Sequence, residues 1–433
     1  MNQSPNAAAA ENPWKQSETL PRPGAGPLAL ACVLYGLGSL AIPLSFLQPW
    51  IAMVFWALLM VGGFYLTRRV TSGAKLTLAA AALACLVGLF IPAFGAVITA
   101  LAIGLLGGAF FQTCTRQFWV LGLISAAATA GVFALTRDWT FCLLAVSLLP
   151  ASLLLGAATR RGAYRTTAVG LALGGFLLWG LVLFLCWVGR TTGSVGLGAI
   201  RSVLNDWQNT LIQTQISWRD EHIAVFRETI ADNPSWNAAQ VANVEALIDV
   251  VMERMSDANI ADSVAWIFNL LPGVVFALCA IPAFLGQKML NAAYATNGMG
   301  RVITPEAEFF TMSVPAAVLY IVSMAVMLLF PSSFSIPVIV ASNLCIMLMP
   351  GFLVLGTRFL FNRFFSAGGN ARWVPVVIAA VFLFCCLWSV IFNALYLCAL
   401  LGAYERIWRA VRRRMAEKFK NQDSDNDHSD NSF

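Results

Sequence analysis

Uncharged polar residues beside helix-breaking residues are the features of this sequence whose types and spacing could do chemistry. They lie in apolar stretches of the second half of the chain, in the order Asn269, Pro272 and Gly273, then Asn343, Pro350 and Gly351, then Asn393. Because proline removes a backbone donor, we expect broken helices here, whose backbone and amide groups line a cavity for an uncharged ligand. The alternative is hydrogen bonding between neighbouring helices, which is the commoner use of such amides. Gln112, in an earlier apolar stretch, allows the same two interpretations.

Catalytic groups are missing from the apolar stretches. No ionisable residue stands at the centre of any of them, which argues against proton relays, paired intramembrane aspartates and an HExxH metal site. The chain also has no Walker motif. The sequence therefore predicts a protein that is not an enzyme and that uses neither a metal nor another cofactor.

The amino-acid composition indicates which kind of structural element positions these amides. Hydrophobic residues make up 59% of the 433 residues and charged residues 11%, whereas a soluble domain carries about 25% charged residues. A bilayer-spanning helix needs about 20 apolar residues, and the apolar runs here are long and continuous. These numbers exclude a soluble enzyme and predict an all-α polytopic integral membrane protein.

The helix breakers and charge clusters divide the chain into about twelve transmembrane helices. We expect seven spans within 27–189, at 27–44, 49–67, 76–92, 94–113, 118–136, 139–158 and 166–188. A further five spans lie within 264–404, at 264–285, 314–330 and 336–357, and as a pair within 373–404 that breaks near Ser389 and Asn393. GxxxG spacing at Gly104 and Gly108, and at Gly170 and Gly174, predicts close helix contacts.

The distribution of basic residues orients these spans. With both termini cytoplasmic and twelve spans, most of the 27 basic residues fall on the cytoplasmic side, as the positive-inside rule requires. Eleven spans would place the basic C-terminal region outside. We therefore expect a multi-pass protein of the bacterial inner (plasma) membrane with both termini in the cytoplasm.

Residues 190–263 form an extracytoplasmic segment, which we call the insert. It carries ten acidic and five basic residues, and apolar positions recur at helical spacing in both of its halves. We expect a packed helical cap with a solvated acidic face. The functional alternative is an acidic docking surface or a cation site.

The termini form three further regions. We predict a disordered cytoplasmic tail at 1–26, a basic amphipathic helix on the cytoplasmic membrane surface at 405–420, and an acidic disordered tail at 421–433. The residues expected at the membrane surface are Arg406, Trp408, Arg409, Arg412, Arg413 and Arg414. The apolar strip beside these arginines favours contact with anionic lipid headgroups over nucleic acid.

The second half also resembles the YybS-like family of predicted bacterial membrane proteins of unknown function. The similarity lies in Leu271-Pro272 opening a span that exits through 285–290, in 308–310 leading into Val314-Pro315, and in Gly402 to Glu405 continuing to Trp408 and Arg412. The chain departs from the family at 311–313 and at Glu405. The family is distantly like the substrate-binding subunits of vitamin importers, so the resemblance implies a role in transport.

Two classes of function follow. The first is a small-molecule binding or transport component that holds an uncharged or apolar ligand between helices, alone or with a transporter subunit. The second is a membrane scaffold or regulatory protein that engages an envelope partner through the insert. The first predicts a polar-lined cavity near Asn269, Asn343 and Asn393. The second predicts tight packing there and an exposed apolar stripe on the insert.

Overall fold

The computed structural model describes residues 23–68, 92–231, 237–298, 312–330, 335–365 and 388–429, and every regular element in these ranges is an α-helix. Eight helical segments of the described residues are long and apolar enough to cross a membrane, and one of them, Trp139–Arg160, consists of two consecutive helices. The predicted span at 76–92 falls almost wholly outside the described residues. So do the first part of 373–404 and most of the tail at 1–26.

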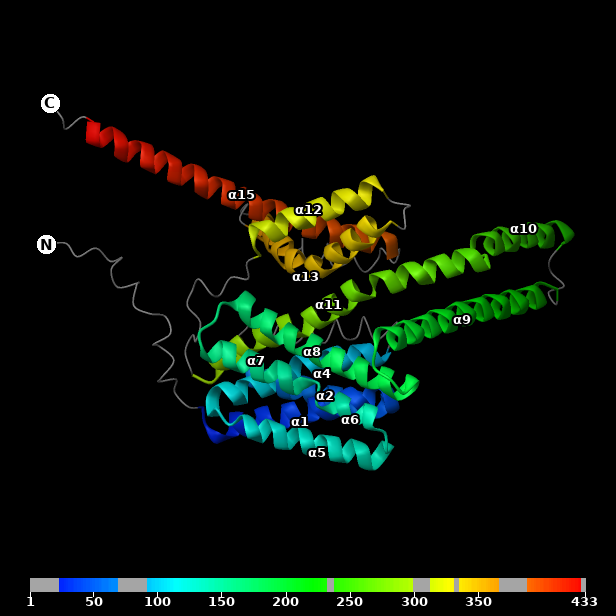
Figure 1. Ribbon diagram of the computed structural model, residues 1–433, viewed down its shortest axis with the longest axis horizontal. Coiled ribbons are helices and arrows are strands. Elements are labelled where there is room, and N and C mark those ends of the chain that lie inside the picture. Colours follow the sequence, from blue (N-terminus) through cyan, green and yellow to red (C-terminus); the bar gives the residue numbers. More distant parts are fainter. Residues whose placement is uncertain are drawn as a thin grey trace.

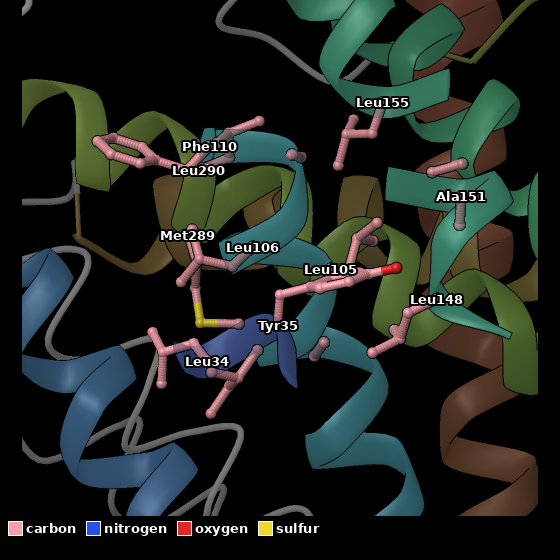
Figure 2. Close-up of a cluster of buried hydrophobic side chains, with 14 of the residues drawn as sticks. Leu34, Tyr35, Leu105, Leu106, Phe110, Leu148, Ala151, Leu155, Met289 and Leu290 are labelled. Carbon is pink, nitrogen blue, oxygen red and sulfur yellow. The ribbon is translucent and has the colours of Figure 1, made fainter. Parts of the chain in front are cut away.

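The first bundle contains the helices that precede the insert. They are α1 (Ala25–Leu47), α2 (Pro49–Thr67), α4 (Pro92–Thr115), α5 (Phe118–Thr136), α6 (Trp139–Ala145), α7 (Leu148–Arg160) and α8 (Arg165–Thr192). Helix α4 lies at the centre, and its Leu105, Leu106 and Phe110 are fully buried against α1, α7 and the end of α11 (Asp257–Thr296). Figure 2 shows these side chains beside Tyr35 and Leu290.

Small residues allow this close approach, as the spacing of Gly104 and Gly108 predicted. A Cβ on Gly104 would lie 3.3 Å from the Cα of Gly38 in α1, and one on Gly108 would lie 2.7 Å from the Tyr35 ring. The same expectation is wrong for Gly170 and Gly174, where an added Cβ meets no atom of the described residues within 4 Å. The contact of α8 with α7 uses the neighbouring Gly175, because that residue faces the backbone of Ala151.

The insert forms a projecting pair of helical arms (Figure 1). Helix α9 (Leu197–Ala231) leads away from the bundle, and α10 (Ala238–Arg254) and the start of α11 return beside it. At 35 residues, α9 is about 52 Å long. Helix α10 begins at a capping box, because the Asn237 side chain accepts from the backbone of Gln240 and the Gln240 side chain accepts from that of Asn237. Helix α11 runs unbroken through the predicted boundary at 263–264.

The remaining helices form a second cluster. They are α12 (Val314–Leu329), α13 (Ile336–Phe365) and α15 (Trp388–Ser429), with Tyr320, Phe352 and Ala399 in the core. A Cβ on Gly356 of α13 would collide with the carbonyl of Cys398 in α15, so these two helices cross backbone to backbone. Helix α15 continues without a break through Asn393 and through 421–429, where we expected a disordered tail.

Candidate functional site

The amide of Asn343 joins α13 to α11. Its Oδ1 accepts from the backbone N–H of Gly273 at 2.8 Å, and its Nδ2 donates to the carbonyl of Asn269 at 2.7 Å. Residues 269 and 273 are the two that a regular helix would join directly to each other. The second N–H of the amide donates to the carbonyl of Ile339 within α13 at 2.9 Å. The amide therefore joins the helices through one donor and one acceptor, and its other N–H is satisfied within α13.

The residues beside this amide adjust the helices without breaking them. Pro272 lies inside α11 and Pro350 inside α13, and both helices continue, so the expectation of broken helices at these prolines is wrong. Gly273 is needed for contact, because a Cβ there would lie 3.0 Å from both oxygens of Asn343. Gly351 faces Met312, whose sulfur would lie 2.8 Å from an added Cβ. The side chain of Asn393 lies outside the described residues.

The broken helix lies elsewhere, in the segment predicted as a single span at 139–158. The chain leaves α6 and enters α7 through Val146 and Ser147. Pro150 explains the break, because it has no N–H to donate to the carbonyl of Val146, which accepts from Leu149 instead. The carbonyl of Leu143, next to the break, accepts from the N–H of Val146 and also from the indole of Trp179 in α8, the latter at 2.9 Å. Pro150 was the signal in the sequence that could have located it.

Gln112 is buried between α4 and α7. Its side chain is 6% exposed, and its methylene carbons would lie within 3 Å of a Cβ on Gly156. Its Oε1 has no hydrogen-bond partner in the part of the chain that the structure describes. Gln112 therefore lies apart from Asn269 and Asn343, which the structure brings together.

One arginine clamps the insert. The guanidinium of Arg219 in α9 is bonded to the carboxylate of Asp220 at 2.8 Å, to the carboxylate of Asp257 at 2.7 Å and to the carbonyl of Met255 at 2.6 Å. The bonds to Asp257 and Asp220 raise the pKa of Arg219 above its usual value, so it stays charged. The bonds to Met255 and Asp257 fix the middle of α9 to the corner where α10 ends and α11 begins.

The opposite face of α9 carries an exposed apolar row. Trp207, Leu211, Trp218 and Val225 are between 42% and 62% exposed. With Thr214 and Glu221 they occupy positions spaced alternately by four and three residues, the 3.5-residue repeat of a coiled-coil seam. A shallow groove of about 630 Å³ runs beside the row and includes Trp218 and Glu221. The exposed stripe that the scaffold hypothesis predicted is thus present on the insert.

A second ion pair ties the first bundle together next to the insert. The guanidinium of Arg190, near the end of α8, lies 2.5 Å from the carboxylate of Asp138, which caps the start of α6 by accepting from the N–H of Thr140. That backbone bond and the arginine lower the pKa of Asp138. The pair holds α6 and α8 together at the end of the bundle from which the insert leaves.

The arginines expected at the membrane surface differ in their contacts. Arg406 donates from Nε to the carbonyl of Met312 at 2.6 Å, so it joins α15 to the start of α12. Arg409 pairs with Glu405, and the guanidinium of Arg412 lies 4.9 Å from the ring centre of Trp408. Arg413 and Arg414 are exposed. The charges that can face lipid are therefore those from 409 onwards.

A cavity of about 490 Å³ lies at the other end of the bundle, where α1 begins and α2 and α11 end. Gly26 and Leu30 line it from α1, Tyr65 and Arg68 from α2, and Thr296 and Asn297 from α11. The guanidinium of Arg68 lies over the ring of Tyr65, 3.8 Å from its centre. Thr296 is 5% exposed, and its hydroxyl has no hydrogen-bond partner among the described residues. Sequence reasoning missed this cavity because three segments far apart in the chain form it.

The chain matches no protein-family model, no curated protein and no solved structure. The resemblance to the YybS-like family therefore stays a prediction.

Proposed function

We propose that this protein is a membrane scaffold whose insert binds an amphipathic helix of an envelope partner. The observation that carries the proposal is the exposed row on α9, whose 3.5-residue repeat is the geometry that a second helix recognises. A row of large apolar side chains facing water is costly unless a partner covers it.

The chemistry of the partner follows from the charges around the row. Asp206, Glu221 and Glu228 stand on α9 itself. A helix with an apolar strip and flanking lysines or arginines would complement these carboxylates and would associate faster at low salt. The Arg219 clamp supports the proposal because it holds α9 in place before a partner arrives, which lowers the entropic cost of binding.

This function places the protein in the bacterial inner membrane with both termini cytoplasmic and the insert outside. The bonds of Asn343 also support the scaffold function, because they pack α11 against α13 at the place where a transport component would need a passage for its ligand. The orientation and the partner are both parts of the proposal.

Site-specific photocrosslinking in cells tests the proposal. A photoreactive residue at Leu211 is expected to give one discrete adduct with a basic amphipathic segment of another protein. The same residue at Arg227, exposed on another face of α9, is the matched control and should not give it. Trp218→Ala should weaken the Leu211 adduct. Identical products from both positions, or adducts only with a second copy of this chain, would contradict the proposal.

Small-molecule binding is the second candidate function, and the cavity at the ends of α1, α2 and α11 favours it. Its volume is within the range of ligand pockets, and its lining includes the apolar Leu30 and Leu66 as well as Arg68. Native mass spectrometry of the gently purified protein should then show a retained ligand. Gly26→Phe, which adds a large side chain at a lining position of the cavity, should lower its retention.

A further inference from the structure

We propose that Arg165, Lys288 and Arg358 bind the phosphate group of an anionic phospholipid at the end of the bundle opposite to the insert. The site is built from three cations on three helices and from an apolar stripe that leads to them. It uses none of the residues that line the cavity at the ends of α1, α2 and α11, and it does not depend on the scaffold function.

Two of the cations meet at one aromatic ring. The guanidinium carbon of Arg165, the first residue of α8, lies 5.4 Å from the ring centre of Phe284 in α11, and Nζ of Lys288 lies 5.6 Å from the same ring centre. The two charged groups are therefore at most about 11 Å apart. Arg358 of α13 is close enough for its charge to repel that of Lys288, as the charge of Arg165 also does. Three helices thus bring like charges to one place.

Gln287 holds the buried arginine in position. Arg165 is 7% exposed and Gln287 is 1% exposed, and Nε of Arg165 donates to Oε1 of Gln287 at 2.7 Å. The amide is neutral, so it orients the guanidinium without cancelling its charge. Arg165 therefore adds a fixed positive field behind Lys288 and Arg358. These two side chains are partly exposed, so they are the groups that can contact a ligand.

The three helices supply no carboxylate near this cluster. Helices α8 and α13 contain no acidic residue, and those of α11 are Asp257 and Asp262 at its beginning. Asp262 is separated from Lys288 by about 39 Å of helix. Like charges that are held together in a partly buried place repel one another, and a bound anion relieves this repulsion. Phosphate accepts from several lysine and arginine donors at once, and basic pockets between membrane helices bind the phosphates of lipid headgroups.

An apolar stripe on α11 indicates that the phosphate belongs to a lipid. Its members recur at alternating steps of four and three residues, and each is exposed or partly exposed. They are Ile267, Leu271, Val274, Leu278, Ile281 and Leu285. Lys288 continues the stripe by one further step of three residues. From Ile267 to Lys288 the helix rises about 32 Å, close to the thickness of a bilayer core, so Lys288 lies at the level of the headgroups when the stripe faces acyl chains. A free phosphate ion would not need such a stripe.

Native mass spectrometry of the detergent-purified, full-length protein tests the assignment. The protein is mixed in separate samples with phosphatidylglycerol, with phosphatidylethanolamine, or with phosphatidylglycerol and an excess of inorganic phosphate. Phosphatidylglycerol should be retained above phosphatidylethanolamine, because the cluster repels the ammonium group of the latter, and inorganic phosphate should not displace it. Equal retention of the two lipids, a preference for phosphatidylethanolamine, or displacement by inorganic phosphate would overturn the assignment.

Variants locate the lipid at the cluster. Lys288→Gln and Arg358→Gln should each lower the retention of phosphatidylglycerol about fivefold, the effect of one basic residue near a membrane surface. Gln287→Glu keeps the size of the side chain and its acceptor for Arg165 but adds a negative charge. It should lower retention at least as much, without lowering the melting temperature. Arg413→Gln removes an exposed arginine from the projecting half of α15 (Figure 1) and should leave retention unchanged.

The control variant separates a defined site from general surface charge. If Arg413→Gln lowers retention as strongly as Lys288→Gln, while both variants melt like the wild type, surface charge alone holds the lipid and the inference is wrong. If Gln287→Glu leaves the retention of phosphatidylglycerol unchanged, the charge of Arg165 does not act on the ligand and the three-cation site is wrong. Neither result changes the crosslinking expected at the insert, so the scaffold function is tested separately.

Discussion

At the crossing of α11 and α13, the amide of Asn343 takes the place of a peptide unit. It accepts from Gly273 and donates to Asn269, so it completes the backbone of a helix to which it does not belong. Few side chains can do this, because only an amide carries a donor and an acceptor in the same plane at the right separation. The contact between α11 and α13 therefore depends closely on the identity of this one side chain.

Asn343→Asp is the sharpest test of that arrangement. The two side chains have the same shape, but the aspartate places an oxygen where Nδ2 donates to the carbonyls of Asn269 and Ile339. A charge in an apolar span costs about 2.5–3.5 kcal/mol, whereas Asn343→Leu should cost about 1 kcal/mol because Gly273 can bond to Asn269 instead. Thermal unfolding in detergent should rank wild type above Asn343→Leu and Asn343→Leu above Asn343→Asp. Ser342→Ala, at the next buried position, should have little effect, and an Asn343→Asp variant as stable as the leucine variant would refute the bonding role.

Asp138 makes the stability depend on pH. The N–H of Thr140 and the guanidinium of Arg190 lower the pKa of Asp138 in the folded protein, relative to about 3.9 in an unfolded chain. Its contribution is therefore complete above about pH 4 and is lost as the pH falls through the lower folded value. The difference in melting temperature between wild type and Asp138→Asn should be small, positive and constant near neutral pH, because the pair is exposed. This difference in melting temperature should shrink on acidification. A difference that grows below about pH 4 would show that folding raises the pKa of Asp138 instead of lowering it.

At the scale of the elements, glycines decide which helices touch. Gly356 lets α13 meet the backbone of α15, and Gly104 lets α4 meet α1, while Gly174 faces open space. The sequence does not distinguish these three glycines, because the difference lies in which atoms face each of them in the folded protein.

Gly356→Ala and Gly174→Ala form a matched pair. A Cβ at position 356 would collide with the carbonyl of Cys398, and overpacking against backbone costs about 1–3 kcal/mol. A Cβ at position 174 meets nothing, so alanine should stabilise α8 by about 0.5–1 kcal/mol. Melting temperatures should move in opposite directions, and a shift of the same sign for both would contradict the crossing of α13 and α15.

The ends and breaks of the helices show how far the sequence could predict these elements. Charge-free runs bounded by Gln48-Pro49 and Arg137-Asp138 locate the ends of α1 and α5, because chain reversals outside a membrane need polar residues. The break between α6 and α7 was missed, and breaks were expected wrongly at Pro272 and Pro350. Whether a proline ends a helix depends on how the freed backbone is satisfied and on the contacts around it, and some of these, such as the bond from Trp179 to Leu143, come from another part of the chain. The pairing of Asn343 with residues 70 or more positions away was hidden for the same reason.

At the scale of the whole molecule, several exposed aromatic residues of the first bundle lie at helix ends. Trp50 and Trp139 begin α2 and α6, and Tyr65 and Tyr164 lie at the ends of α2 and the start of α8. Helix α2 alone is about 28 Å long, close to the thickness of a bilayer core, with an exposed aromatic residue near each end. The insert extends beyond one end of the bundle and the C-terminal half of α15 beyond the other, as Figure 1 shows.

This arrangement predicts that the insert and α15 lie on opposite sides of the membrane. On a cysteine-free background, Asn209→Cys in α9 and Ala416→Cys in α15 each place one thiol on an exposed position. An impermeant maleimide should label position 209 in intact cells, and position 416 only after permeabilisation, because the positive-inside rule keeps the arginines from 406 to 414 in the cytoplasm. Removal of the native thiols matters, since Cys186 is itself exposed near the end of α8. Labelling of position 416 but not of position 209 in intact cells would reverse the orientation. Labelling of both positions in intact cells would mean that the chain crosses the membrane an even number of times between them, which contradicts the prediction.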